Sequence, residues 1–313
     1  MKDFRNVIFI LVILTFLLQM YVTNSDNAKN AANDTPMVAV STFSLYDITK
    51  HIAGDSVEII NILPFGVDPH SFEPTPKLMA DIEKSSLVFF SGAGLEPWTH
   101  GFSFKNRAID MSKHVKLREL DADEHEHHKH NDKQCAHNTI DPHYWLDFTN
   151  MQNATELIKN ELIVLRPKYK EMYEKNAANY THMLQKLDKK YKKNLSSCRF
   201  DTVIVNHNAI GYLSQNYHFN VESLSGLSPE AEPSASDITR IFKEIKDEGI
   251  STIFFESFVN DKAITTVAND AKVKLEVIQP LGNITADEAK KDASYEDIMY
   301  VNLNKLSKAL KCN

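Results

Sequence analysis

Glycine and cysteine are scarce in this sequence, and basic residues are fewer than acidic ones. Lys and Arg number 35 against 42 Asp and Glu, which gives a formal charge of −7, and the chain has only 9 glycines and 3 cysteines. A nucleic-acid-binding surface needs a basic stripe, so we expect no nucleic-acid partner. The remaining composition, 42% hydrophobic and 25% charged, is that of a globular protein. A length of 313 residues predicts two domains of roughly 100–150 residues each.

Two motifs that would indicate an enzyme or a nucleotide site are also missing. The sequence contains no H-E-x-x-H pair, the tight motif of many zinc hydrolases. The turn Gly92-Ala93-Gly94 lacks the third glycine of a dinucleotide fingerprint, and Pro97 stands in its place. We interpret this turn as a tight connection, and we expect the chain not to be an enzyme.

The N-terminus carries a run of 16 largely apolar residues, Val7–Val22, behind Lys2 and Arg5. A basic start before an apolar core is typical of a secretory signal peptide, and a spanning helix needs about 20 residues. No Ala-x-Ala cleavage pattern and no cysteine for lipid attachment follow it. We predict that residues 1–25 are a signal peptide, with an uncleaved N-terminal anchor as the alternative. Either arrangement places the rest of the chain outside the cytoplasm, and we expect it in the periplasm.

Three cysteines allow one disulfide in an oxidising compartment. Cys135 lies inside a histidine-rich stretch, whereas Cys198 and Cys312 lie outside it. The candidate disulfide is therefore Cys198–Cys312.

Residues 121–137 combine histidines and acids with no large apolar side chain. Such a segment cannot bury enough surface to fold alone, so we predict a solvated loop. One interpretation is that this segment is only a polar insertion without a function. Dense imidazoles bind zinc, copper or nickel, so we favour auxiliary metal capture by the five histidines of this loop: His125, His127, His128, His130 and His137.

Strand-like and helix-like segments alternate in both halves of the chain. This order predicts parallel βαβ units, and therefore an α/β fold with two parallel-sheet lobes, residues 36–149 and 195–313. The expected strands are residues 37–41, 57–63, 87–90, 202–205, 250–255 and 275–278, and the expected helices are residues 45–52, 76–84, 210–216, 237–248, 261–271 and 295–309.

Residues 150–194 have helical periodicity and connect the two halves. Pro167 should break or kink this segment. A helix of about 26 residues from Lys168 would span roughly 39 Å. We predict that this long, rigid helix links the lobes.

The tripeptide Asp-Pro-His occurs twice, at residues 68–70 and 141–143, each time with an aromatic residue within two positions. Proline sets its own φ and restricts the residue before it, so His70 and His143 are held on stiff backbone. A third histidine, His207, follows the expected strand of residues 202–205. Two of the three lie in the first half and one in the second, so they can converge only in a cleft between the lobes. Three neutral imidazoles suit zinc, with a fourth position for carboxylate or water.

Several segments together match the pattern of one family. The chain resembles the ZnuA-like zinc-binding members of the TroA-type solute-binding proteins of ABC transporters, over nearly all of its length after the apolar start. The resemblance implies two lobes joined by a rigid helix, with the metal in the interlobe cleft and His70, His143 and His207 as its ligands. The matching segments are residues 68–76, 94–98, 121–137, 141–147, 206–212 and 254–256.

One position departs from the family pattern. Many relatives carry an aspartate where this chain has Gln279, and an amide cannot supply a charged oxygen. A manganese site would want that carboxylate, so its absence favours zinc held by three histidines and water. Glu256, Glu73 and Gln279 remain as other candidates for the fourth position.

The resemblance predicts a high-affinity zinc-binding component of a zinc-uptake ABC transporter, which captures Zn²⁺ as cargo and delivers it to a membrane permease. Manganese or iron delivery is the alternative within the transporter class. An extracytoplasmic zinc hydrolase and a metal-binding adhesin are the rivals from other classes. We expect a monomer that contacts the membrane only through the permease or an uncleaved N-terminus.

Overall fold

The computed structural model describes residues 35–119, 140–227, 229, 233–257 and 262–313. The predicted signal segment (1–25) and the histidine-rich segment (121–137) lie outside these residues. Among the described helices, none combines the length and the apolar character needed to cross a membrane.

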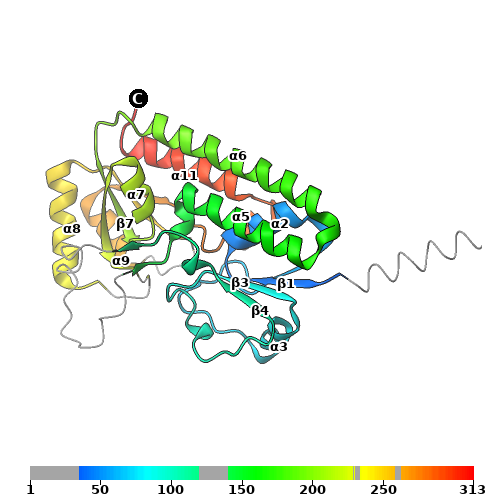
Figure 1. Ribbon diagram of the computed structural model, residues 1–313. Helices are drawn as coiled ribbons and strands as arrows, with labels where there is room; N and C mark the ends of the chain where they lie inside the picture. The colour runs from blue at the N-terminus through cyan, green and yellow to red at the C-terminus, as the bar shows by residue number, and fades with distance from the viewer. Residues whose placement is uncertain (1–34, 120–139, 228, 230–232, 258–261) are drawn as a thin grey trace, which may run out of the picture.

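Two parallel four-stranded sheets form the centres of two lobes (Figure 1). The first sheet has the order β2-β1-β3-β4, and the second has the order β10-β9-β7-β8. All neighbouring strands within each sheet are parallel, so the predicted α/β fold is confirmed. The strands are β1 (Met37–Val40), β2 (Glu58–Asn61), β3 (Leu87–Phe90), β4 (Arg107–Asp110), β7 (Thr202–His207), β8 (Asn220–Ser225), β9 (Thr252–Phe255) and β10 (Lys274–Val277).

The N-terminal lobe carries helices α2 (Phe43–Ala53) and α3 (Pro76–Lys84). Helix α3 begins as its sequence predicts, with Pro76 in the first turn and the hydroxyl of Thr75 accepting a hydrogen bond from the backbone N–H of Leu78 at 3.3 Å. A small antiparallel pair, β5 (Arg118–Glu119) and β6 (Ile140–Asp141), flanks the histidine-rich segment in sequence. Short 3₁₀ turns lie at Gly54–Ser56, Pro97–Thr99, Met111–Lys113 and Tyr144–Leu146.

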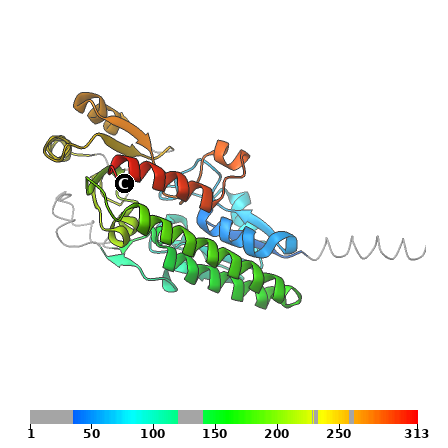
Figure 2. The same cartoon turned by 90° about the horizontal axis from the view of Figure 1, so that it is seen from above.

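The link between the lobes is a helical hairpin. Helix α5 (Phe148–Leu165) and helix α6 (Lys170–Asn194) lie side by side, joined by a 3₁₀ turn at Pro167–Tyr169 (Figures 1 and 2). The break falls at Pro167, as predicted, because proline cannot continue an α-helix. Helix α6 has 25 residues and spans about 38 Å, so it is the long helix that the sequence predicts, starting two residues later.

The C-terminal lobe carries α7 (Gly211–Tyr217), α8 (Ala235–Glu248) and α9 (Lys262–Ala271). Helix α8 begins two residues earlier than expected, at Ala235, because Ser234 is its N-cap. Ser234 and Asp237 form a capping box, in which each side chain bonds the backbone N–H of the other.

The last part of the chain returns toward the N-terminal lobe through α10 (Ala286–Lys290) and α11 (Tyr295–Ala309). Helix α11 lies beside α6 (Figure 2), and the hydroxyl of Tyr191 on α6 donates to the backbone oxygen of Met299 on α11 at 2.7 Å. The described cysteines Cys198 and Cys312 form a disulfide with sulfur atoms 2.00 Å apart, next to the end of α11.

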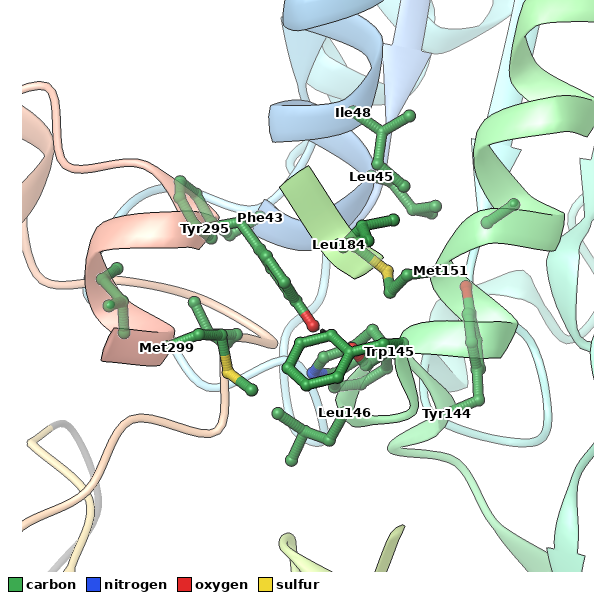
Figure 3. Close-up of a cluster of buried hydrophobic side chains, with 14 of the residues drawn as sticks. Phe43, Leu45, Ile48, Tyr144, Trp145, Leu146, Met151, Leu184, Tyr295 and Met299 are labelled. Atoms are coloured by element: carbon green, nitrogen blue, oxygen red, sulfur yellow. Dashed lines mark hydrogen bonds between the residues drawn. The ribbon is translucent and has the colours of Figure 1, made fainter. Parts of the chain in front are cut away.

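One apolar cluster joins both lobes. Figure 3 shows side chains from α2, α5, α6 and α11 gathered around Trp145, which is fully buried. Its indole N–H donates to the backbone oxygen of Pro280 at 2.5 Å, and its own backbone oxygen accepts from the hydroxyl of Tyr295 at 2.6 Å. Trp145, which follows His143 by two residues, is therefore hydrogen-bonded to two segments that follow the second sheet in sequence.

Candidate metal centre

His70 lies in the loop after β2, and its backbone is held from two sides. A carboxylate oxygen of Asp68 accepts a hydrogen bond from the backbone N–H of His70 at 3.1 Å. The side-chain amide of Asn283, which follows the second sheet, donates to the backbone oxygens of Pro64 and Val67 at 2.7 Å each. Asn283 is fully buried, so these bonds tie the His70 loop to the returning chain.

His143 is buried and bonded to the aspartate of its own Asp-Pro-His motif. A carboxylate oxygen of Asp141 accepts from the backbone N–H of His143 at 3.0 Å and lies 2.8 Å from its Nδ1. A carboxylate only accepts, so the imidazole proton is on Nδ1 and Nε2 keeps its lone pair. This is the carboxylate–histidine arrangement that orients metal ligands.

His207 is the last residue of β7 and is 2% exposed. We expected it just past the end of the strand, but its pairing with Ser225 extends the ladder by two residues. Its Nδ1 contacts a carboxylate oxygen of Glu256 without the direction of a hydrogen bond, and within the described residues neither ring nitrogen has a hydrogen-bond partner. Buried polar atoms are normally paired, so an imidazole without hydrogen bonds suits the role of a metal ligand.

The three predicted histidines converge. One ring nitrogen from each of His70, His143 and His207 lies within 4.8 Å of the others. The Nε2 atoms of His70 and His143 are 3.3 Å apart. Two nitrogens bound at about 2.0–2.1 Å to a tetrahedral zinc would lie about 3.3–3.4 Å apart, so this pair already has the spacing that zinc requires.

The electrostatics keep His70 in its ligand form. Burial, followed by the nearby rings of His143 and His207, holds the pKa of His70 well below its ordinary value. A lowered pKa favours neutral imidazole, the form that binds metal.

The candidates for the fourth position occupy different places. Glu73 is exposed, and Glu256 lies against the Nδ1 of His207. Gln279 is buried, with its side-chain N–H₂ donating to Glu288 at 2.8 Å, whereas its side-chain oxygen has no partner among the described residues. The group of metal-ligating side chains in the described part of the chain contains the three histidines and no carboxylate. The five histidines assigned to auxiliary capture lie outside the described residues.

Sequence reasoning assigned no role to Asp141, Asn283 or Tyr212, although all three position the cluster or its neighbours. A signal existed for the first, because an aspartate precedes both His70 and His143 by two residues. The other two act across the lobes, and nothing in the local sequence indicates such contacts.

A two-lobed α/β fold with an imidazole cluster between its lobes defines a metal-binding solute-binding protein. Residues 38–309 match the family model described as zinc-uptake complex component A, periplasmic, also called ZnuA. The chain therefore belongs to this family, and the resemblance predicted from its motifs is confirmed.

Named relatives agree with this assignment. The chain is 30% identical over 302 residues to the high-affinity zinc uptake system protein ZnuA of Bacillus subtilis strain 168, covering 94% of each chain. It is also 30% identical over 301 residues to the zinc-binding lipoprotein AdcA of Streptococcus pneumoniae strain R6. That match covers 94% of this chain but only 60% of AdcA.

Solved structures give the same picture. The Zn(II)-bound ZnuA-like domain of Streptococcus pneumoniae AdcA superposes with a TM-score of 0.72 at 28% identity, covering 88% of this chain and 99% of that domain. The laminin-binding protein Lmb of Streptococcus agalactiae gives a TM-score of 0.77 at 26% identity, covering 88% of this chain and 99% of Lmb. Lmb is described as a bifunctional protein with adhesin and metal-transporting activity.

Proposed function

We propose that this chain is the zinc-binding component of a zinc-uptake ABC transporter, which captures Zn²⁺ with high affinity outside the cytoplasm and delivers it to a membrane permease. The observation that carries the proposal is the convergence of His70, His143 and His207 from two lobes. Zinc is cargo, and the family is a class of solute-binding proteins, not a class of enzymes.

The ligand chemistry favours zinc over manganese or iron. Imidazole nitrogen suits zinc, whereas manganese prefers carboxylate and carbonyl oxygen. Gln279 replaces the carboxylate that a manganese site would use, and Glu256, which contacts Nδ1 of His207, is not in the ligand group. We infer three histidines with water, or the oxygen of Gln279, in the fourth position.

Ligands divided between lobes suit capture and release. His70 and His143 belong to the N-terminal lobe and His207 to the C-terminal lobe, so a small separation of the lobes removes at least one ligand. Docking on the permease opens the lobes and releases the ion. The histidines of residues 121–137 collect zinc weakly before the three-histidine site takes it. The chain works as a periplasmic monomer, exported by its first 25 residues or anchored by them.

The similarity to Lmb favours one second candidate, a metal-binding adhesin. Binding of the metal-free chain to host-cell surfaces would support that reading. A zinc hydrolase is a weaker rival, and generic ester and phosphate substrates test it cheaply.

The test of the proposal is a calorimetric titration of the chain lacking residues 121–137 with zinc, and separately with manganese. We expect one tight zinc site that manganese does not displace at equal concentration. Tight manganese binding would move the function to the alternative metal. Loss of all tight zinc binding with the deleted segment would contradict the three-histidine site.

His70 should not contribute to the loss of zinc binding as the solution becomes moderately acidic. The unfolded value of a histidine pKa is about 6.5, and His70 is held well below it, so His70 stays neutral when ordinary histidines are protonated. The same shift destabilises the metal-free fold below about pH 6.5, because the unfolded chain then binds the proton more tightly. Chelator competition between about pH 7 and pH 6 measures the zinc dependence. A loss proportional to the third power of proton concentration would contradict the lowered pKa.

A further inference from the structure

Asp141 contacts an arginine in addition to His143. Its second carboxylate oxygen pairs with the guanidinium of Arg118 at 3.1 Å, across the β5–β6 pair. Asp141 is fully buried and the side chain of Arg118 is 12% exposed. A buried carboxylate needs such partners, so Arg118 helps to hold the Asp141 side chain in place facing His143.

Tyr212, from the other lobe, forms hydrogen bonds with the backbone of both Asp141 and Arg118. Its hydroxyl donates to the backbone oxygen of Asp141 at 3.0 Å and accepts from the backbone N–H of Arg118 at 2.8 Å. Tyr212 is 3% exposed, and burial raises the pKa of its phenol, so the hydroxyl keeps the proton that it donates. One side chain of α7 thus bonds both strands of the β5–β6 pair.

Gly211 permits this close contact because it has no side chain. A Cβ on Gly211 would lie 2.8 Å from the guanidinium carbon of Arg118 and 2.9 Å from a carboxylate oxygen of Asp141. Real Cβ atoms do not approach other atoms so closely, so any larger residue would displace the ion pair. The start of α7 therefore packs closely against the Arg118–Asp141 pair.

We propose that Arg118, Gly211 and Tyr212 form an interlobe latch that positions Asp141, and through it His143, relative to His207. Asp141 precedes His143 by two residues, and Tyr212 follows His207 by five. The latch therefore joins the chain beside one ligand to the chain beside a ligand of the other lobe. Its three members are positioning residues that do not touch the metal. The expected effect of the latch on zinc binding rests on the function proposed above. Its expected effect on the orientation of His143 does not.

Loss of the latch should leave His143 less well oriented. Removal of a partner that orients a ligand typically costs about 10–100-fold in metal affinity. Tyr212→Phe removes both hydrogen bonds and keeps the ring, so we expect zinc to dissociate about tenfold faster. Arg118→Gln removes the charge that faces Asp141 and should act in the same direction.

Tyr191→Phe is the matched control. Its hydroxyl is also buried and also donates to a backbone oxygen, that of Met299, but it joins α6 to α11 and touches neither histidine motif. A merely structural role for Tyr212 predicts equal effects of the two substitutions on stability and on zinc release.

The experiment combines two readouts on the full chain. In the metal-free protein labelled with ¹⁵N-histidine, nuclear magnetic resonance follows the Nδ1-bound proton of His143, assigned with His143→Gln. In the zinc-loaded protein, stopped-flow chelation measures zinc release. We expect Tyr212→Phe to shift or broaden the His143 resonance and to speed release, and Tyr191→Phe to do neither. Should Tyr212→Phe not fold, Arg118→Gln provides the same comparison.

An unchanged His143 resonance in the latch variants overturns the latch, whatever the protein does with zinc. Failure of the wild-type chain to bind zinc tightly counts against the proposed function alone, because the resonance of the metal-free protein still reports the latch. A changed resonance with an unchanged release rate would also overturn the proposal, since His143 would then not depend on its orientation to hold zinc.

Discussion

Replacing His143 by alanine should lower zinc affinity by more than about 100-fold. Removal of a residue that only orients a ligand costs about 10–100-fold, and removal of the ligand itself should cost more. His143 is 2% exposed, and its Nε2 faces that of His70 at 3.3 Å, so no neighbouring water-exposed group can take its place without rearrangement. Competition with a calibrated zinc chelator, on the chain lacking residues 121–137, measures the change.

His182→Ala is the control for this substitution. His182 is an exposed histidine on α6 and does not belong to the ligand group. Its loss should leave zinc affinity within about twofold of the wild type, a change too small for a lost ligand. Equal affinities for His143→Ala and His182→Ala would show that the zinc site lies elsewhere.

Loss of the Cys198–Cys312 disulfide should lower the free energy of unfolding by about 2–5 kcal/mol. The two cysteines are 114 residues apart in sequence, and a disulfide that closes a loop of about 100 residues is worth about 4.7 kcal/mol in the chain-entropy model. The double variant Cys198→Ala, Cys312→Ala tests this by urea denaturation against the oxidised wild type. The unfolding midpoint should move to lower urea concentration.

Cys135→Ala is the matched control for the disulfide. It removes the remaining cysteine and should leave the midpoint unchanged if Cys198 pairs only with Cys312. A midpoint that falls with Cys135→Ala, or that stays constant in the double variant, would contradict the pairing.

The central strands of both sheets and the edge strands β2 and β10 could be predicted from sequence, whereas the edge strands β4 and β8 could not. Strand β3 is a short apolar run with three buried residues, which is typical of a buried strand. Strands β4 and β8 lie at the edges of their sheets, where one side faces outward and the sequence mixes polar and apolar residues. Neither β4 nor β8 is among the strands expected from the sequence.

His70 and His143 could be predicted because rigid local motifs carry them, and His207 because it follows an expected strand. Each Asp-Pro-His sets its own backbone and supplies its own aspartate. The contacts that bring these motifs together come from distant segments, such as Asn283 on the His70 loop and Tyr212 on the strands beside His143. Those contacts depend on how the lobes pack, and no local periodicity encodes them.

X-ray absorption at the zinc edge, on the zinc-loaded chain lacking residues 121–137, tests the central claim most directly. The claim is that one zinc ion is held between the lobes by His70, His143 and His207. We predict three imidazole nitrogens at about 2.0–2.1 Å with one light oxygen or nitrogen neighbour, and the loss of one imidazole in His207→Ala. A wild-type spectrum with fewer than three imidazoles, or one that His207→Ala leaves unchanged, would contradict the claim.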